Sequence, residues 1–530
     1  MARRLVVLIA AFVLAATPAA LAKGFLWGVA TAGFQGDMGP GAPNDPNSDW
    51  WVWVRDPDNI ANHRVSGDLP ENGPAQWTHY KQDIALAHDK LHANAFRLSI
   101  EWSRIFPRST AGATTTAELD ALADQSALAH YRAVLTAIRR AGMTPFVTLD
   151  HFTLPLWIHD PIAARNAFAS VGPDDPPPAI GSRGGWLDPT TITEFAKYAS
   201  YVATKLGDLI DYYTPLNEPN VTAIQGYLNV PGVFAAWFPP GVFNFGAVIQ
   251  ATMNEARANA AAYDAIKTTD PAARVGLVQH FIDWRPKNPK SSADRRGTSH
   301  ADYLFNRLFL EAAIKGDYDA NANGVIDAGE SHPELARKAD FLGINYYRPG
   351  RATGLTQPLS KQIPLYDFVP TVSYTRKTCP TTCTDLGWEI YPAGMGDVIR
   401  EAGRYKLPLY VTENGIADAK DRKRAKFITD HVRAMRKAIK AGANVRGYFY
   451  WSLEDNLEWS GGYAPQFGLF TKSRRMRNSA EVFASLRPKD PPGRRYLCRP
   501  ARSSRSGSSR GTAGGSPLRS RTNPCLRSPS

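Results

Sequence analysis

Short apolar runs rich in β-branched and aromatic residues alternate with longer segments of helical period along most of the chain. The runs of strand character are 25–32, 95–102, 144–152, 212–218, 274–281, 340–347, 408–414 and 445–453. Segments with apolar residues every three or four positions lie between them, among them 76–90, 127–142, 191–207 and 421–442. Near-continuous apolar strands need cover on both faces, which helices between successive strands provide. The pattern predicts one α/β domain, a (β/α)8 TIM barrel of parallel strands.

A doubly wound open sheet is the alternative, but no Gly-rich phosphate-binding fingerprint follows the first strand. Insertions rich in Pro, Gly and Trp interrupt the alternation at 37–75, 153–189, 229–246 and 348–392. In a barrel such insertions decorate the rim and shape a pocket. The barrel domain is predicted to span 23–486.

The first 22 residues have the pattern of a secretory signal peptide. Two arginines precede an apolar run from Leu5 to Ala16, and a small-x-small end follows at Ala20-Leu21-Ala22. The run is short for a bilayer span, so cleavage after Ala22 is favoured over an uncleaved anchor. The sequence predicts a secreted or periplasmic protein without stable membrane insertion.

The net charge of +13 is concentrated at the C-terminus. Residues 487–530 hold 11 Lys and Arg against one Asp, which leaves about +3 for residues 1–486. This Arg-, Ser-, Gly- and Pro-rich stretch is predicted to be a basic disordered tail that binds polyanions weakly at most. The body is nearly neutral, so nucleic acid is not an expected partner, and polyanion binding is supported only by the tail. Cys379 and Cys383 are placed to form a local disulfide after export, whereas Cys498 and Cys525 lie in the tail.

Polar and aromatic side chains gather at the predicted carboxyl ends of the strands, where barrel enzymes place their reactive groups. These residues are Gln35, Arg97, His151, Asn217, Glu218, Asn345, Tyr347, Glu413, Trp451, Glu458 and Trp459. Glu218 ends the fourth strand and Glu413 ends the seventh, so they are expected to face each other across the barrel axis. Two carboxylates about 5 Å apart suit retaining glycoside hydrolysis, in which one attacks the anomeric carbon and the other transfers protons. Taken singly, either glutamate is more often an ordinary strand-end charge.

Seven motifs in order give this pattern a family resemblance. They are GFLWGVATAGFQ, FRLSIEWSRIFP, TLDHFTLPLW, TPLNEPN, DFLGINYY, YVTENG and WSLEDNLEWSGGYAPQFGL. From about Gly24 to Leu486 the chain resembles glycoside hydrolase family 1, the β-glucosidase and β-galactosidase family. Stretches such as SDWWVWVRDP and LPLWIHDPIAAR resemble its thermophilic archaeal β-glycosidases.

The resemblance implies a role for each matching residue. Glu413 in TENG matches the nucleophile, Glu218 in NEP matches the acid/base, and Tyr347 and Arg97 match the residues that orient the nucleophile. Asn345, in the same motif as Tyr347, is grouped with these catalytic residues.

The resemblance also implies how the sugar is held. Gln35, His151, Asn217, Glu458 and Trp459 match positions that hydrogen-bond the non-reducing sugar, and Trp451 matches the platform beneath its ring. The acidic Glu458 predicts unphosphorylated glycosides, because it would repel a phosphate. His151 is followed by Phe152 where the family usually has tryptophan, a departure that bears on substrate preference.

The segment DANANGVIDAGE fits a calcium-loop template. Its oxygen ligands would come from Asp319, Asn321, Asn323, Asp327 and Glu330, and Gly324 would allow the sharp turn. A polar surface turn is the alternative. No cofactor is expected for catalysis, so calcium at this loop would be structural.

The sequence therefore predicts a secreted, retaining exo-β-glycosidase that releases terminal β-linked glucose, and also galactose or fucose, from small β-glycosides or oligosaccharides. A β-mannosidase or a transglycosidase of the same family is the nearest alternative. A non-catalytic sugar-binding relative is disfavoured because both glutamates are present. The sequence predicts neither the natural aglycone nor the oligomeric state.

Overall fold

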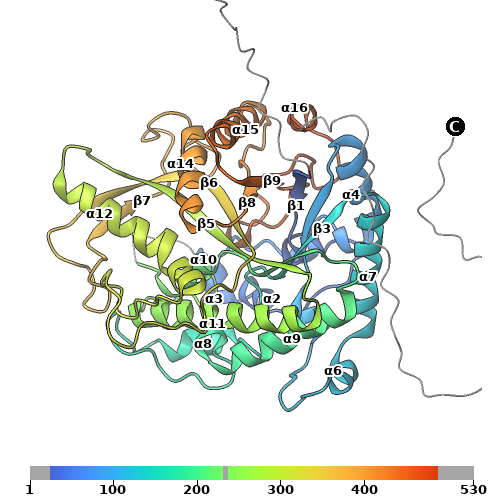
Figure 1. The fold of residues 1–530 in the computed structure, drawn as a ribbon, viewed down its shortest axis with the longest axis horizontal. Coiled ribbons are helices and arrows are strands. Elements are labelled where there is room, and N and C mark those ends of the chain that lie inside the picture. The colour runs from blue at the N-terminus through green and yellow to red at the C-terminus, as the bar shows by residue number, and fades with distance from the viewer. Residues whose placement is uncertain (1–23, 231–236, 488–530) are drawn as a thin grey trace, which may run out of the picture.

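Eight parallel strands close into a barrel at the centre of the molecule (Figure 1). A computed structural model of the protein describes residues 24–230 and 237–487. The barrel strands are β1 (Leu26–Ala30), β2 (Ala95–Ser99), β3 (Thr144–Asp150), β4 (Tyr212–Leu216), β5 (Arg274–Pro286), β6 (Phe341–Gly354), β8 (Leu409–Asn414) and β9 (Val445–Trp451). Each pairs with the next in this order, and pairing of β9 with β1 closes the ring. The predicted (β/α)8 barrel is confirmed, and the open sheet is excluded.

The eight predicted strands are all present, but β5 and β6 run further than their apolar patterns indicated. The cause lies in the insertion 348–392, part of which returns as β7 (Phe368–Thr371) and pairs antiparallel with the extended end of β6. Arg351 stands opposite Thr371, and Gly354 stands opposite Phe368. The paired ends of β6 and β7 thus extend the sheet beyond the carboxyl end of the barrel.

Helices surround the barrel, one following each strand (Figure 1). In strand order these are α4 (Gln76–Ala85), α7 (Gln125–Arg140), α9 (Thr190–Leu206), α11 (Phe245–Thr269), α12 (Ser292–Asp302), α14 (Pro392–Ala402), α15 (Arg424–Lys440) and α16 (Asn478–Ser485). The predicted helical segments are confirmed as α4, α7, α9 and α15. The sequence pattern did not single out α11, whose many small residues are buried on more than one face and blur a single apolar stripe.

Shorter helices lie in the connections. They are α1 (Gly33–Gly36), α2 (Asp49–Trp53), α3 (Pro57–Ala61), α5 (Trp102–Ile105), α6 (Thr116–Leu122), α8 (Pro161–Ala167), α10 (Pro219–Tyr227) and α13 (Leu308–Leu310). Two of the predicted insertions, 37–75 and 153–189, carry α2, α3 and α8.

Aromatic side chains fill the interior of the barrel. Phe146 stacks on Tyr212 with ring centroids 5.1 Å apart, and Phe341 and Phe449 meet Phe146 edge-on at 5.2 Å. Room for these rings comes from small neighbours, since a Cβ at Gly28 would lie 2.6 Å from the Phe449 ring. The barrel is therefore a packed core and not a pore, and a ligand can reach it only from the ends of the strands.

Several predictions concern the ends of the chain. The predicted signal peptide 1–22, Cys498, Cys525 and all but the first residue of the predicted tail 487–530 lie outside the described residues. Cys379 and Cys383 form a disulfide with their Cα atoms 6.1 Å apart, as their spacing allowed. Among the helices of the described ranges, none is both long and apolar enough to cross a membrane.

Candidate active site

A cleft opens at the carboxyl ends of the barrel strands. It encloses about 1250 Å³, counting the part that is open to solvent. Of the predicted site residues, the lining includes Glu218, Glu413, Tyr347, His151, Trp451, Glu458 and Trp459. The two glutamates therefore share one cavity, as expected from their places on the fourth and seventh barrel strands.

The carboxylate of Glu413, near the end of β8, is held by two donors. Arg97 on β2 donates to Oε1, and the Tyr347 hydroxyl donates to Oε2 over 2.5 Å. Arg97 lies in the middle of β2 rather than at its end, because the strand stops at Ser99. Burial raises the pKa of Glu413; the Arg97 guanidinium opposes that rise, and the carboxylate of Glu218 adds to it. A cation and a hydroxyl on separate oxygens favour the ionised form of this group.

Glu218 lies where β4 passes into α10, in a backbone conformation that favours glycine. Its φ is 50° and its ψ is 55°, and Pro219 occupies the first position of α10. Pro219 disfavours a right-handed helical conformation at Glu218, so the chain turns there and the carboxyl group is buried at the cleft. Asn345 donates to its Oε1 over 2.5 Å, and His280 Nδ1 lies 3.3 Å from its Oε2. The proline therefore helps to aim this side chain.

A buried hydrogen-bond network connects the two glutamates behind the cleft. Asn217 Oδ1 accepts from Arg97 over 2.5 Å and from Asn345 over 3.2 Å, and Asn345 Oδ1 accepts from Thr412 over 2.7 Å. An irregularity in the pairing of β6 with β8 places Asn345 beside Glu413. Arg97, Asn217 and Asn345 thus fix the glutamates from behind instead of lining the cavity.

The residues predicted to hold the sugar ring form an aromatic wall. The His151 ring stacks with Trp451 at a centroid distance of 5.7 Å and with Trp459 at 6.0 Å. Burial lowers the pKa of His151 well below its usual range, and Arg97 adds to the effect, so the imidazole is neutral at pH 7. Burial raises the pKa of Glu458 to about 8, with a further rise caused by Glu413. Both groups can therefore donate and accept hydrogen bonds.

Like Asn217, Gln35 is a predicted sugar-binding residue that does not line the cavity. It is buried on α1, where its Nε2 donates to the carbonyl of Leu457 over 2.9 Å, next to Glu458. Within the described ranges, several buried polar atoms around the cleft have no partner, namely Gln35 Oε1, His151 Nδ1, His280 Nε2 and Glu458 Oε2. Buried polar atoms usually find partners, so this set suits a ligand rich in hydroxyl groups.

Sequence reasoning missed four residues of the site. His280 is the last residue but one of the apolar run 274–281, so the strand-end rule itself could have found it, and Thr412 directly precedes Glu413. Arg348 directly follows Tyr347, and both Arg348 and Trp388 line the cleft. Trp388 lies deep in an insertion without periodic pattern, so no local signal pointed to it.

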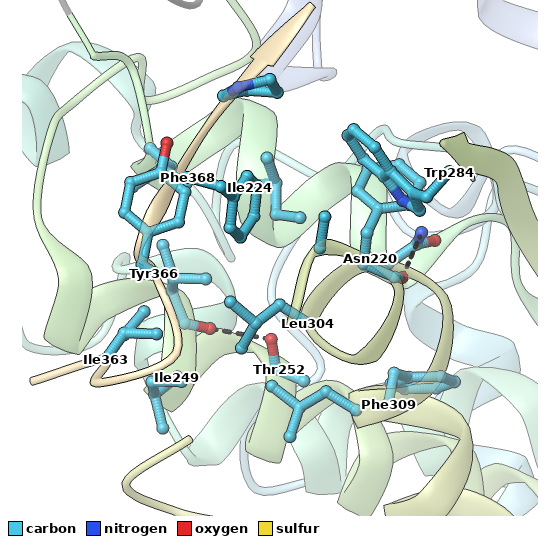
Figure 2. A pocket seen from close by; sticks show the side chains of 16 residues that line it. Asn220, Ile224, Ile249, Thr252, Trp284, Leu304, Phe309, Ile363, Tyr366 and Phe368 are labelled. Carbon is cyan, nitrogen blue, oxygen red and sulfur yellow. Dashed lines mark hydrogen bonds between the residues drawn. The ribbon is translucent and has the colours of Figure 1, made fainter. Parts of the chain in front are cut away.

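A second cavity lies outside the barrel between α10, α11, α12 and the segment around β7 (Figure 2). Figure 2 shows Ile224, Leu304, Phe309 and Phe368 around a common space of about 680 Å³, part of which is open to solvent. Thr252, one of its few polar groups, donates to its own helix at Val248. No predicted site residue lines this cavity, and no carboxylate does, so it has no group suited to cleaving a glycosidic bond.

The predicted calcium loop forms a compact turn away from the cleft. Asp319 is fully buried and accepts from the backbone amides of Asn323 and Gly324 and from the Tyr303 hydroxyl. Glu330 accepts from the amides of Ala320 and Asp327. Over the described residues, no group of three or more His, Cys, Asp or Glu has a geometry that could hold a metal ion. Calcium at this loop stays a prediction.

The fold and the paired carboxylates define a class of protein. A (β/α)8 barrel carries two buried glutamates from opposite strands, one beside a cation and a tyrosine hydroxyl, next to aromatic rings and unpaired polar atoms. These are the groups that a glycoside hydrolase uses to bind and cleave a glycoside.

Comparisons with known proteins give the family. The model of glycosyl hydrolase family 1 matches residues 17–164 and 174–490. A β-galactosidase of Pyrococcus woesei is 39% identical over 509 residues, covering 87% of this chain and 96% of that protein. A β-galactosidase of Sulfolobus acidocaldarius is 37% identical over 493 residues, covering 88% of this chain and 94% of that protein. The solved β-glycosidase of Thermosphaera aggregans is 34% identical, with a TM-score of 0.76 over 88% of this chain and 96% of that one. The chain belongs to glycosyl hydrolase family 1, and it is a glycoside hydrolase acting on O-glycosyl bonds.

Proposed function

We propose that the protein is a retaining exo-β-glycosidase that removes terminal β-linked glucose or galactose from small glycosides. The observation that carries this proposal is the unequal environment of two carboxylates in one cleft. Glu413 is held by Arg97 and Tyr347, whereas Glu218 is held by an amide and a histidine. Double displacement requires this inequality, because one group must attack as an anion and the other must carry a proton.

In this mechanism Glu413 attacks the anomeric carbon while Glu218 gives its proton to the departing oxygen. A covalent glycosyl–Glu413 ester forms, and the bond to the aglycone breaks. Esterification removes the charge of Glu413, after which Glu218 takes a proton from water and the hydroxyl oxygen displaces Glu413 with a second inversion. An alcohol in place of water would give transglycosylation. Asn217, Asn345 and Thr412 keep both glutamates in position throughout.

Sugar recognition follows from the wall around His151. Aromatic faces pack on the C–H surfaces of a pyranose, and neutral His151, Gln35 and Glu458 offer their unpaired polar atoms to its hydroxyls. The relatives are named β-galactosidase and β-glucosidase, which supports glucose and galactose ahead of fucose or mannose. The predicted signal peptide at 1–22 makes the enzyme a secreted or periplasmic one.

A panel of nitrophenyl glycosides assayed with wild type, Glu413→Gln and Glu218→Gln tests this function. Wild type is expected to hydrolyse the β-glucoside and β-galactoside, and each variant is expected to lose about a thousandfold or more in kcat, since each removes a group that acts in the transition state. Proton NMR of the first product should show the β-anomer. An α-anomer would exclude the covalent step, and wild type inactive on the whole panel would favour a sugar-binding role.

A further inference from the structure

Arg348 is a charged residue in the cleft for which the mechanism above has no use. It follows Tyr347 on β6, and its guanidinium lies 4.4 Å from the centre of the Trp388 ring. Burial lowers the pKa of Arg348 to about 10, with Glu218 opposing the shift, so the group is cationic at neutral pH. Among the lining residues of the cleft that the structure describes, it is the one Lys or Arg.

The hydrogen bonds of Arg348 leave Nε and Nη2 without a partner among the described residues. Nη1 donates to the carbonyl of Val372 over 3.0 Å. Nε is buried and has no partner within the described ranges, and no described carboxylate lies within 4.0 Å of the guanidinium. Other arginines nearby are paired: Arg351 lies 3.1 Å from Glu389, and Arg285 lies 2.7 Å from Asp397. A buried cation without a counter-ion is costly, so an unpaired one facing a cavity suits an anionic ligand.

The position of Arg348 assigns that ligand to the aglycone. The sugar-binding wall is His151, Trp451, Glu458 and Trp459, whereas Arg348 belongs to the other part of the lining, with Trp388 and Val372. Leu386 adds an apolar side chain in the same packed group as Trp388. Nη2, which has no hydrogen bond to a described residue and is not among the buried atoms, can receive a carboxylate through a charge-assisted hydrogen bond.

We propose that Arg348 selects β-glycosides whose aglycone is an aromatic ring bearing a carboxylate, such as the glycoside of a phenolic acid. The inference rests on the proposed function and names its leaving group. Glu218 is the carboxyl group that acts electrostatically on Arg348, and in the proposed mechanism it serves as the acid, so the aglycone carboxylate is the anion available to pair with Arg348.

A matched pair of substrates tests this assignment: the 4-carboxyphenyl β-glycoside and its methyl ester, made with the sugar that wild type hydrolyses fastest. The readout is the ratio of kcat/KM for the acid to kcat/KM for the ester. Arg348→Gln is expected to lower this ratio about tenfold or more, because a charge-assisted bond to the acid is lost, while activity on the ester changes by less than about threefold. Arg348→Lys keeps the charge but not the position of Nη2 and should fall between the two.

Arg55→Gln is the control variant, since Arg55 also stacks on a tryptophan, Trp51, but lies outside the cleft lining. It should leave the ratio unchanged, and retained activity on the ester shows that each variant is folded. An unchanged ratio in Arg348→Gln would overturn the proposal. Equal losses on acid and ester would also overturn it, because Arg348 would then act through Glu218. Wild type inactive on both substrates and on nitrophenyl glycosides would instead overturn the proposed function.

Discussion

The behaviour of Glu413 depends on two opposing effects at a single side chain. Burial favours its neutral form, whereas Arg97 and the Tyr347 hydroxyl favour the anion that the proposed attack requires. The Tyr347 hydroxyl lies 2.5 Å from Oε2, and its own pKa is raised well above the usual range, first by burial and then by Glu413. It therefore stays protonated and remains a donor at working pH.

Tyr347→Phe is expected to lower kcat/KM by about 10- to 100-fold, the loss typical of a hydrogen bond to a charged group. Because the bond lowers the pKa of Glu413, its removal raises that pKa, and in more of the enzyme Glu413, the proposed nucleophile, is protonated at low pH. The acidic limb of the profile of kcat/KM against pH should therefore move to higher pH. A limb that stays in place would show that Tyr347 only shapes the cleft.

Glu458 gives a prediction about stability. Its pKa in the folded protein is about 8, raised by burial and by Glu413, against 4.5 without these influences. The folded state thus keeps a proton that the unfolded chain loses, and this carboxyl lowers stability as pH rises from about 4.5 to 8. Glu458→Gln has no such proton to lose. The difference between the free energy of unfolding of the variant and that of wild type should therefore increase in favour of the variant by up to about 1.4 kcal/mol per pH unit in that window.

Urea unfolding of both proteins at pH 5 and pH 8 measures this difference. Glu481→Gln, which alters an exposed carboxylate on α16, is the matched control and should follow wild type at both values. A gap between Glu458→Gln and wild type that does not change with pH would contradict the assigned protonation state.

At the scale of elements, the ends of the barrel strands position the side chains of the candidate active site. The backbone turn at Glu218 and the irregular pairing beside Asn345 both occur where regular hydrogen bonding stops. Phe152 and Trp459, also at the cleft, have φ values of 70° and 50°. Three of the eleven non-glycine residues with positive φ in the described ranges thus line the cleft, where the surrounding structure holds them in place.

The loop 319–330 is the element on which the calcium prediction can be tested. If the ion binds, the midpoint of thermal unfolding should rise with millimolar Ca²⁺ and fall with a chelator, by an amount equivalent to about 2.7 kcal/mol at a hundredfold excess over Kd. Asp327→Asn should weaken the response without changing activity, because the loop does not line the cleft. Identical unfolding with Ca²⁺ and with chelator would refute the prediction.

At the scale of the whole molecule, the closed barrel explains why the site needs distant segments. Arg97 and Glu413 are 316 positions apart in sequence, and Glu218 and Asn345 are 127 apart. The last barrel helix, α16, ends at Ser485, and nothing beyond Pro465 lines the cleft among the described residues.

A chain that stops after Arg487 is therefore expected to keep kcat/KM on nitrophenyl glycosides within about twofold of the full chain. Removing the following basic residues should also abolish any salt-sensitive retention on a polyanion resin, because the remaining body is nearly neutral. A large loss of activity on truncation would show that the tail takes part in catalysis or folding.

The sequence by itself determined the barrel and the identity of most site residues. Apolar periodicity is local, so it marks strands and helices wherever the spacing is regular, and the strand-end rule found Glu218, Glu413 and the wall around His151. It did not single out α11, whose small residues carry no clear stripe, and it did not predict β7, which forms only because β6 offers a free edge.

Only the tertiary structure decided which groups act on each other. The pairing of Glu413 with Arg97, the contact of His280 with Glu218 and the unpaired Nη2 of Arg348 depend on closure of the barrel and on how an insertion folds over its mouth. Contacts between remote segments give no periodic pattern in the sequence, because their energy depends on a geometry that exists only after folding.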